Sequence, residues 1–271
     1  MGQTKMKPTN VFIGAWILNL LLALSWAQTG VGVSPPGQIL TAQPGQEVRG
    51  VVLVDHPSDD APMIVDVSLG DVAVQPDGNL VFLAPGTLPR SAAQWITVQP
   101  LSFNLSPKEA REVHYSVRVP QDVQPGTYWA MLFFNSGPTG KTEETQGVGV
   151  RVHIRVGHII YVNIGEITYS GRVEGMRYLP PSPKNPPEVR VKFHNTGNGL
   201  LRLNGYVELR DAKGQTVARG EIKNAASLPG FSYELAAELA SPPPSGDYVA
   251  LVMLDYGGEK VIVGEGTVHV P

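Results

Sequence analysis

The residues that could carry out chemistry are few and scattered along the chain. There is no cysteine, which excludes disulfide bonds, thiolate zinc sites and cysteine nucleophiles. The six histidines form no cluster. The nearest two, His153 and His158, are an odd number of residues apart and would point to opposite faces of one strand, so they make a poor ligand pair. We expect both to be solvent-facing strand residues.

Motifs of known chemistry are missing as well. The sequence contains no nucleophile elbow, phosphate-binding loop, dinucleotide fingerprint or zinc-protease helix motif. With 21 basic against 24 acidic residues, the formal charge of -3 argues against a nucleic-acid binder, which needs a basic surface for phosphates. We therefore expect a protein that is not an enzyme, uses no cofactor, binds no metal and has no nucleic-acid partner.

The N-terminus has the pattern of an export signal. Lys5 and Lys7 precede an apolar run from Val11 to Leu24, and Ser25-Trp26-Ala27 provides small residues for a signal peptidase. The run is interrupted by Asn19 and is shorter than the ~20 apolar residues of a membrane span. We expect residues 1–27 to be a cleaved signal peptide, with no transmembrane segment after it and an extracytoplasmic location, in the periplasm or at the cell surface.

The rest of the chain is predicted to consist of strands. Apolar residues alternate with other residues from Val113 to Val119 and again from Val148 to Val156, a period of two that places them on one face. Turn residues separate such runs, as in Asp211-Ala212-Lys213-Gly214, where we expect Gly214 to adopt a left-handed conformation. Short strands at this spacing predict an all-β sandwich or barrel.

An internal repeat divides the chain into two similar halves. Val113 to Phe134 aligns without a gap on Tyr233 to Leu254, at a constant offset of 120 residues. Both copies contain a Gly-x-Tyr-x-Ala step, with Tyr128 matching Tyr248. Duplication of one domain type is the better explanation, although strand–turn–strand units can also converge. We expect two tandem domains, residues 28–157 and 158–271, held at a fairly fixed angle because little linker separates them.

The Gly-x-Tyr-x-Ala step predicts the kind of sandwich. Immunoglobulin domains have a tyrosine two residues before the second cysteine of the core, and its hydroxyl bonds back to the backbone of the corner. Tyr128 and Tyr248 stand at that position, with Ala130 and Ala250 in place of the cysteine. We therefore expect two tandem immunoglobulin-like β-sandwich domains with corner tyrosines. Trp129 is then left for the outer sheet face or for a contact between the domains.

These motifs carry a resemblance to a family. The chain is similar to two-domain, cysteine-free bacterial immunoglobulin-like proteins of the periplasmic pilus-assembly chaperone type, and to their surface-located relatives. The similarity rests on Phe103-Asn104-Leu105-Ser106-Pro107, Arg111 to Val119, Pro125 to Trp129, Phe133-Phe134 and the run Gly147 to Val156. It implies a chaperone-like protein with a pilin-like subunit as partner. It also implies a pair of basic residues, one on the first and one on the last strand of the first domain, that anchors the subunit's carboxylate. Arg151 and Arg155 are candidates for the residue on the last strand. The first strand, Val31 to Ala42, contains no Lys or Arg.

Two classes of function stay open at this point. In the first, the protein binds a protein partner of the envelope by adding a strand to the edge of Gly147 to Val156, because backbone bonds supply affinity and alternate side chains supply specificity. The second is a carbohydrate-binding or structural cell-wall protein that uses Trp95, which follows a long insertion, as a platform; packing of Trp95 on the core is its alternative role. The candidate partner-binding residues are Val148, Val150, Arg151, Val152, Ile154, Arg155 and Trp95.

Overall fold

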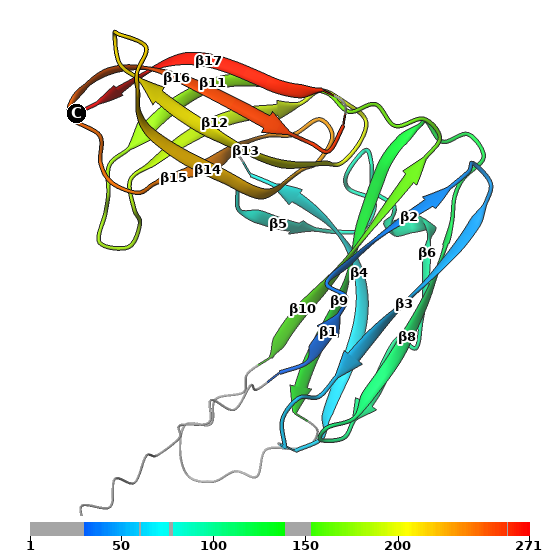
Figure 1. Cartoon of the computed structure of the whole chain (residues 1–271). Coiled ribbons are helices and arrows are strands. Elements are labelled where there is room, and N and C mark those ends of the chain that lie inside the picture. The colour runs from blue at the N-terminus through cyan, green and yellow to red at the C-terminus, as the bar shows by residue number, and fades with distance from the viewer. Residues whose placement is uncertain (1–29, 60, 76–77, 139–152, 259) are drawn as a thin grey trace, which may run out of the picture.

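A computed structural model gives the fold and describes residues 30–59, 61–75, 78–138, 153–258 and 260–271. The expected signal peptide lies outside the described residues. Nearly all regular structure consists of strands, as the alternating sequence predicts, and two groups of strands meet at an angle (Figure 1). No helix among the described residues is long and apolar enough to cross a membrane.

The first domain is a sandwich of two sheets packed face to face. One sheet has the order β1-β3-β8-β6, and the other has the order β2-β10-β9-β4-β5, with β7 also paired to β4. The strands are β1 (Gly32–Ser34), β2 (Gly37–Ala42), β3 (Glu47–Asp55), β4 (Met63–Val74), β5 (Leu80–Leu83), β6 (Ile96–Gln99), β7 (Ser102–Leu105), β8 (Ala110–Arg118), β9 (Gly126–Pro138) and β10 (Ile154–Ile164); a short 3₁₀ turn, η1 (Ala93–Trp95), precedes β6. The alternate residues Val113, Tyr115 and Val117 of β8 are buried between the sheets, as their spacing predicts.

The second domain is built from one sheet that curls on itself. Its order is β11-β12-β15-β14-β13-β16-β17, and the side chains of Val173 and Met176 on β11 lie against Gly264 and Gly266 of β17. Its strands are β11 (Gly171–Leu179), β12 (Glu188–Asn195), β13 (Leu201–Arg210), β14 (Thr216–Ser227), β15 (Ser232–Leu239), β16 (Gly246–Asp255) and β17 (Val261–Val270). The turn between β13 and β14 places Gly214 at φ 77°, which confirms the left-handed glycine.

The two corner tyrosines are equivalent. Tyr128 donates a hydrogen bond to the Gln124 carbonyl at 3.1 Å, and Tyr248 donates one to the Pro244 carbonyl at 2.8 Å. Both rings are buried. The same bond to the residue four positions upstream, formed once in each domain, confirms the expectation from the repeat.

The expected domain boundary after Gly157 falls inside a strand. β10 pairs with β9 without a break from Ile154 to Ile164, so residues 158–164 are part of the first sandwich. The alternating sequence continues across Gly157, and no turn interrupts it. We therefore propose that the boundary lies between Ile164 and Gly171, where β11 begins.

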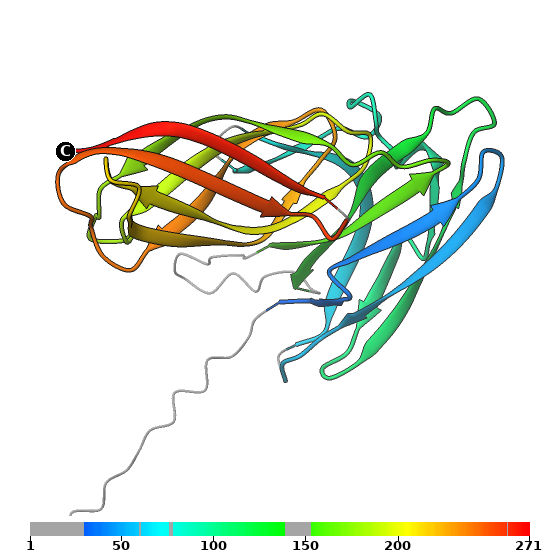
Figure 2. The ribbon, with the colours of Figure 1, turned by 45° about the horizontal axis from the view of Figure 1, so that its top comes forward.

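The two domains are held together by apolar contacts and by hydrogen bonds, such as the one from the Thr127 amide to the Asn198 carbonyl at 2.8 Å. Trp129, 1% exposed, packs in a cluster with Leu200 and Leu228 of the second domain, and its indole N–H donates to the Val72 carbonyl at 2.8 Å. Trp129 is therefore the domain contact rather than an outer-face residue. Figure 2 shows the second domain lying across the end of the first.

Candidate protein-binding edge

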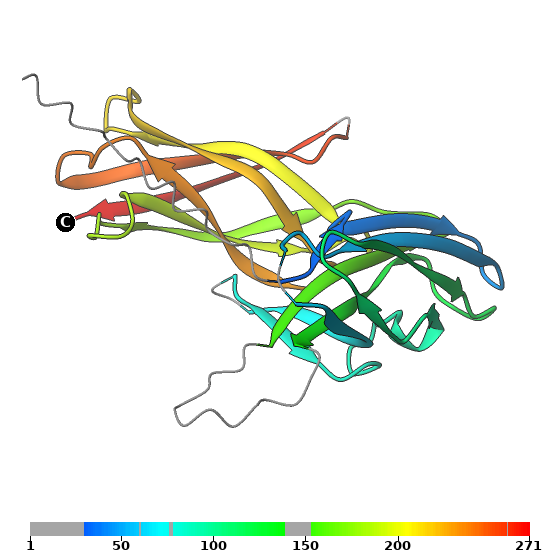
Figure 3. The ribbon, with the colours of Figure 1, turned by 90° about the horizontal axis from the view of Figure 1, so that it is seen from below.

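β10 has two halves that differ in how their edges are paired. Residues Ile159 to Ile164 lie between β9 on one side and the parallel strand β2 on the other. Residues 154–158 are paired with β9 alone, and no other described strand pairs with them. β1 runs nearby, but its hydrogen bonds go to β3 in the opposite sheet. This half of β10, which we call the open half, therefore has an edge that no described strand pairs with. Figure 3 shows the two domains from below.

The direction of the backbone groups follows from one bond. The amide of Ile159 donates to the Pro36 carbonyl at 3.0 Å, so the main-chain groups of Ile159 point toward β2. Main-chain N–H and C=O groups alternate between the two edges of a strand. The corresponding groups of Arg155 and Gly157 therefore point to the open side, and those of Val156 point to β9. The open half presents donors and acceptors to which a further strand could pair.

The side chains of the open half face two environments. Ile154 and Val156 are half-buried, and Val156 packs against the core of the first domain. Arg155 points to the outer face, where its Nε donates to Asn135 Oδ1 at 2.6 Å and its guanidinium lies 5.3 Å from the centre of the Phe133 ring. An added strand would thus lie beside Ile154 and Val156 on the inner face of the sheet and beside the guanidinium of Arg155 on the outer face.

Three of the sequence-predicted residues can be placed. Ile154 and Arg155 belong to the open half, whereas Val148, Val150, Arg151 and Val152 lie outside the described residues. Trp95 is elsewhere: it ends η1, is half-buried against the first core, and its ring centre is 4.7 Å from that of Tyr128. Tyr128 pairs with Val162, in the other half of β10. The structure therefore does not bring Trp95 to the open half.

Trp95 also borders a shallow polar depression at the surface of the first domain. Gln94, Thr97, Arg118 and Gln121 line this depression with it. Much of the apolar surface of the indole is used in packing on Tyr128 and the core. This placement agrees with the packing role that the sequence left open for Trp95.

A buried polar network that sequence reasoning missed lies at the end of the open half. His158 is 0% exposed, which corrects the expectation that it faces solvent. Its Nδ1 is 2.7 Å from the Pro35 carbonyl, and its Nε2 is 3.3 Å from the hydroxyl of Tyr115, which donates to Gln38 Oε1 at 2.7 Å. The even spacing of His158 from Val156 and Ile160 was the signal, because it places all three on the core face.

Burial determines the protonation of this network. A carbonyl can only accept, so Nδ1 of His158 carries the hydrogen of the neutral ring. Burial lowers the pKa of His158, and the bond to the Pro35 carbonyl opposes that shift. Burial raises the pKa of the Tyr115 hydroxyl to about 12. The network therefore joins β2, β8 and β10 without a charge at neutral pH. Residues 31–42, which include β1 and β2, contain no lysine or arginine, so these strands do not provide the first member of the basic pair that the resemblance implies.

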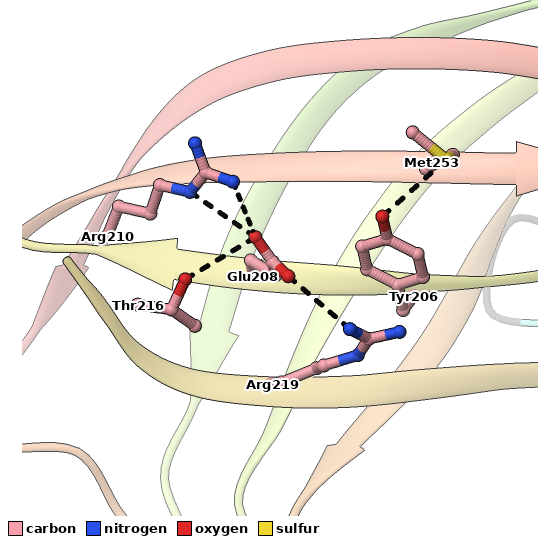
Figure 4. Close-up of polar contacts among 6 residues, drawn as sticks. All are labelled: Tyr206, Glu208, Arg210, Thr216, Arg219 and Met253. Carbon is pink, nitrogen blue, oxygen red and sulfur yellow. Dashed lines mark hydrogen bonds and ion pairs between the residues drawn. The ribbon is translucent and has the colours of Figure 1, made fainter. Parts of the chain in front are cut away.

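The second domain carries a separate cluster of paired charges on its outer face. Arg210 donates to the carboxylate of Glu208 at 2.7 Å, and Arg219 approaches its other oxygen at 3.5 Å (Figure 4). These guanidinium groups, Arg210 foremost, hold the pKa of Glu208 below its usual range. Arg219 also lies 3.7 Å from the centre of the Tyr206 ring. Each charge of the cluster has a partner within it, which is the arrangement of a structural ion-pair network.

Comparisons with known proteins give structural neighbours only. No family model and no curated protein matches the sequence. Among solved structures, the class 5 fimbriae chaperone CfaA is 13% identical, with 89% of this chain and 100% of that chain covered and a TM-score of 0.49. The SafB chaperone, solved with the Salmonella enterica SafA pilin, is 15% identical, with 87% and 95% covered and a TM-score of 0.43. The E. coli chaperone DraB is 15% identical, with 87% and 95% covered and a TM-score of 0.41. CfaA is thus named as a fimbriae chaperone, SafB as a chaperone solved with a pilin, and DraB as a chaperone.

Proposed function

We propose that this chain is an exported, non-catalytic protein-binding module that adds a strand of its partner to the open half of β10. The observation that carries the proposal is the change in pairing at Ile159: β2 pairs with β10 from there onward, whereas no described strand other than β9 pairs with residues 154–158. A partner strand would continue the sheet in the place that β2 leaves.

The chemistry of the open half supports a protein partner over a small molecule. Main-chain groups of Arg155 and Gly157 supply regular hydrogen-bonding sites, and an extended peptide is the ligand that matches them. Ile154 and Val156 offer half-buried apolar contacts for alternate side chains of the added strand. By its resemblance to pilus-assembly chaperones, we infer a pilin-like subunit of the envelope as the class of partner, and an extracytoplasmic location for the complex.

A substitution at one position tests the proposal. Arg155→Pro removes a backbone donor on the open side, whereas Arg155→Ala removes the side chain and keeps the donor. We expect the Pro variant to lose capture of the envelope protein that the parental chain retains from an envelope extract, and the Ala variant to keep it. Both variants must first give the parental circular-dichroism spectrum. A folded Arg155→Pro variant that captures the same protein with parental affinity would overturn the proposal.

A further inference from the structure

The sheet of the second domain is split between β14 and β15. These neighbouring strands pair at only two positions, Gly220 with Leu239 and Glu221 with Glu238. Beyond Glu221 the two strands diverge, although β14 remains paired with β13 and β15 with β12. Each strand therefore has an unpaired edge that faces the other across the split.

The groups on the β15 edge can be identified from the pairing with β12. The amide of Leu239 donates to the Pro187 carbonyl at 2.8 Å, so Leu239 and its alternate neighbours direct their main-chain groups toward β12. By alternation, the N–H and C=O groups of Glu234 and Ala236 point into the split. Glu234 and Ala236 are half-buried, and no described strand pairs with their main-chain groups on this side.

The split forms an apolar groove that faces the first domain. The groove has a volume of about 500 Å³ and contains Ile222 of β14 and Leu235 of β15 in its wall. Val74 and Leu80, from the β4–β5 hairpin of the first domain, line its opposite side, and Figure 1 shows this hairpin in the angle between the domains. The Tyr233 hydroxyl bonds to the Ala226 carbonyl across the split, so the two strands are bridged by a side chain rather than by a main-chain ladder.

We propose that this groove receives a second extended, apolar segment of the same protein partner that adds to β10. Two observations favour this occupant. The main-chain groups of Glu234 and Ala236, which no described strand pairs with, match the main chain of an extended segment, and the apolar wall favours apolar side chains. The groove is also continuous with the proposed interface, since Ile159 and Tyr161 of β10 line it and the open half ends at His158. The inference therefore rests on the proposed function.

Photocrosslinking distinguishes the two proposals. The photoreactive residue p-benzoylphenylalanine is placed at position 155, at position 236 or, as a control, at position 265 on the exposed face of β17. We expect one envelope protein to be crosslinked from both 155 and 236 and none from 265. Mass spectrometry should map the crosslink from 236 to an apolar segment different from the one reached from 155.

The other outcomes have separate meanings. Crosslinking from position 155 without crosslinking from position 236 would overturn the proposal that the groove binds the partner, and would leave the strand-addition proposal intact. Absence of crosslinking from 155 overturns both. As a second measurement, Ala236→Trp fills the groove and should weaken binding of the crosslinked protein at least tenfold, with Glu265→Trp as the matched control. A folded Ala236→Trp variant that binds the crosslinked protein with parental affinity would also overturn the groove proposal.

Discussion

The amide of Ile159 donates to the Pro36 carbonyl at 3.0 Å, and this bond marks where β10 changes from one paired edge to two. The open half is the part of β10 that precedes Ile159. β1 and β2 are successive parts of one segment that changes sheets between Ser34 and Gly37, so β2 covers only the second half of β10. The uncovered half of the strand is a consequence of this change of sheet.

The corner tyrosines give a test of the internal repeat. Tyr128→Phe and Tyr248→Phe each remove one hydroxyl bond to a carbonyl and should each lower the free energy of unfolding by about 0.5–1.5 kcal/mol. Urea denaturation of both variants measures this. Tyr169→Phe, at an exposed position, is the control and should match the parent. If neither corner variant differs from the parent, the two hydroxyl bonds do not stabilise the corners and the corner-tyrosine prediction is wrong.

Trp95 gives a test of packing against binding. Because Trp95 is half-buried against Tyr128 and the core, Trp95→Ala should destabilise the first domain by somewhat less than the roughly 3–5 kcal/mol typical of fully buried aromatic residues. Thermal unfolding measures the loss. Unchanged stability together with loss of carbohydrate binding would instead favour the platform role.

The side chain of Asn198 bonds both to the first domain and to the segment between β10 and β11. Its side-chain amide donates to the Pro125 and Glu166 carbonyls at 3.3 and 3.1 Å, and its carbonyl oxygen accepts from the Thr168 amide at 2.6 Å. Asn198→Ala should loosen the angle between the domains, which small-angle scattering would detect as a broader distribution of interatomic distances. Asn185→Ala, in an exposed loop, is the control. A scattering curve of Asn198→Ala identical to that of the parent would contradict this role.

His158 predicts a pH dependence of stability. Its pKa in the folded chain lies below the value of 6.5 expected for an unfolded one, so the unfolded state binds the proton more readily. The contribution of neutral His158 to the free energy of unfolding is therefore fully present above pH about 6.5, and it is lost as the pH falls toward the pKa of the folded chain. From this one group, the free energy of unfolding should fall by at most about 1.4 kcal/mol per pH unit. Urea denaturation at several pH values should show a shallower decrease for His158→Gln and a parental decrease for the exposed His153→Gln. Identical slopes in His158→Gln and the parent would exclude His158 as the source.

The sequence predicts local features of this fold better than long-range ones. Alternation predicts the buried face of β8, and the Gly-x-Tyr-x-Ala step predicts both corners, because these features depend on neighbouring residues. The extent of β10 could not be predicted, since its apolar alternation continues past Gly157 and the end of its pairing is set by β2, which is distant in sequence. The split between β14 and β15 likewise depends on how strands far apart pair, for which periodicity gives no signal. His158 was misplaced because histidine is usually exposed, although its even spacing from Val156 indicated the core.

Hydrogen exchange of single amides tests the central claim most directly. In the free protein, the amides of Val156 and His158 point to β9 and should exchange slowly, whereas those of Arg155 and Gly157 point to the open edge and should exchange rapidly. NMR of the chain with its captured envelope partner should show the Arg155 and Gly157 amides newly protected, with Val156 unchanged. If the partner is bound and the Arg155 and Gly157 amides exchange as rapidly as in the free chain, binding does not occur by strand addition to β10.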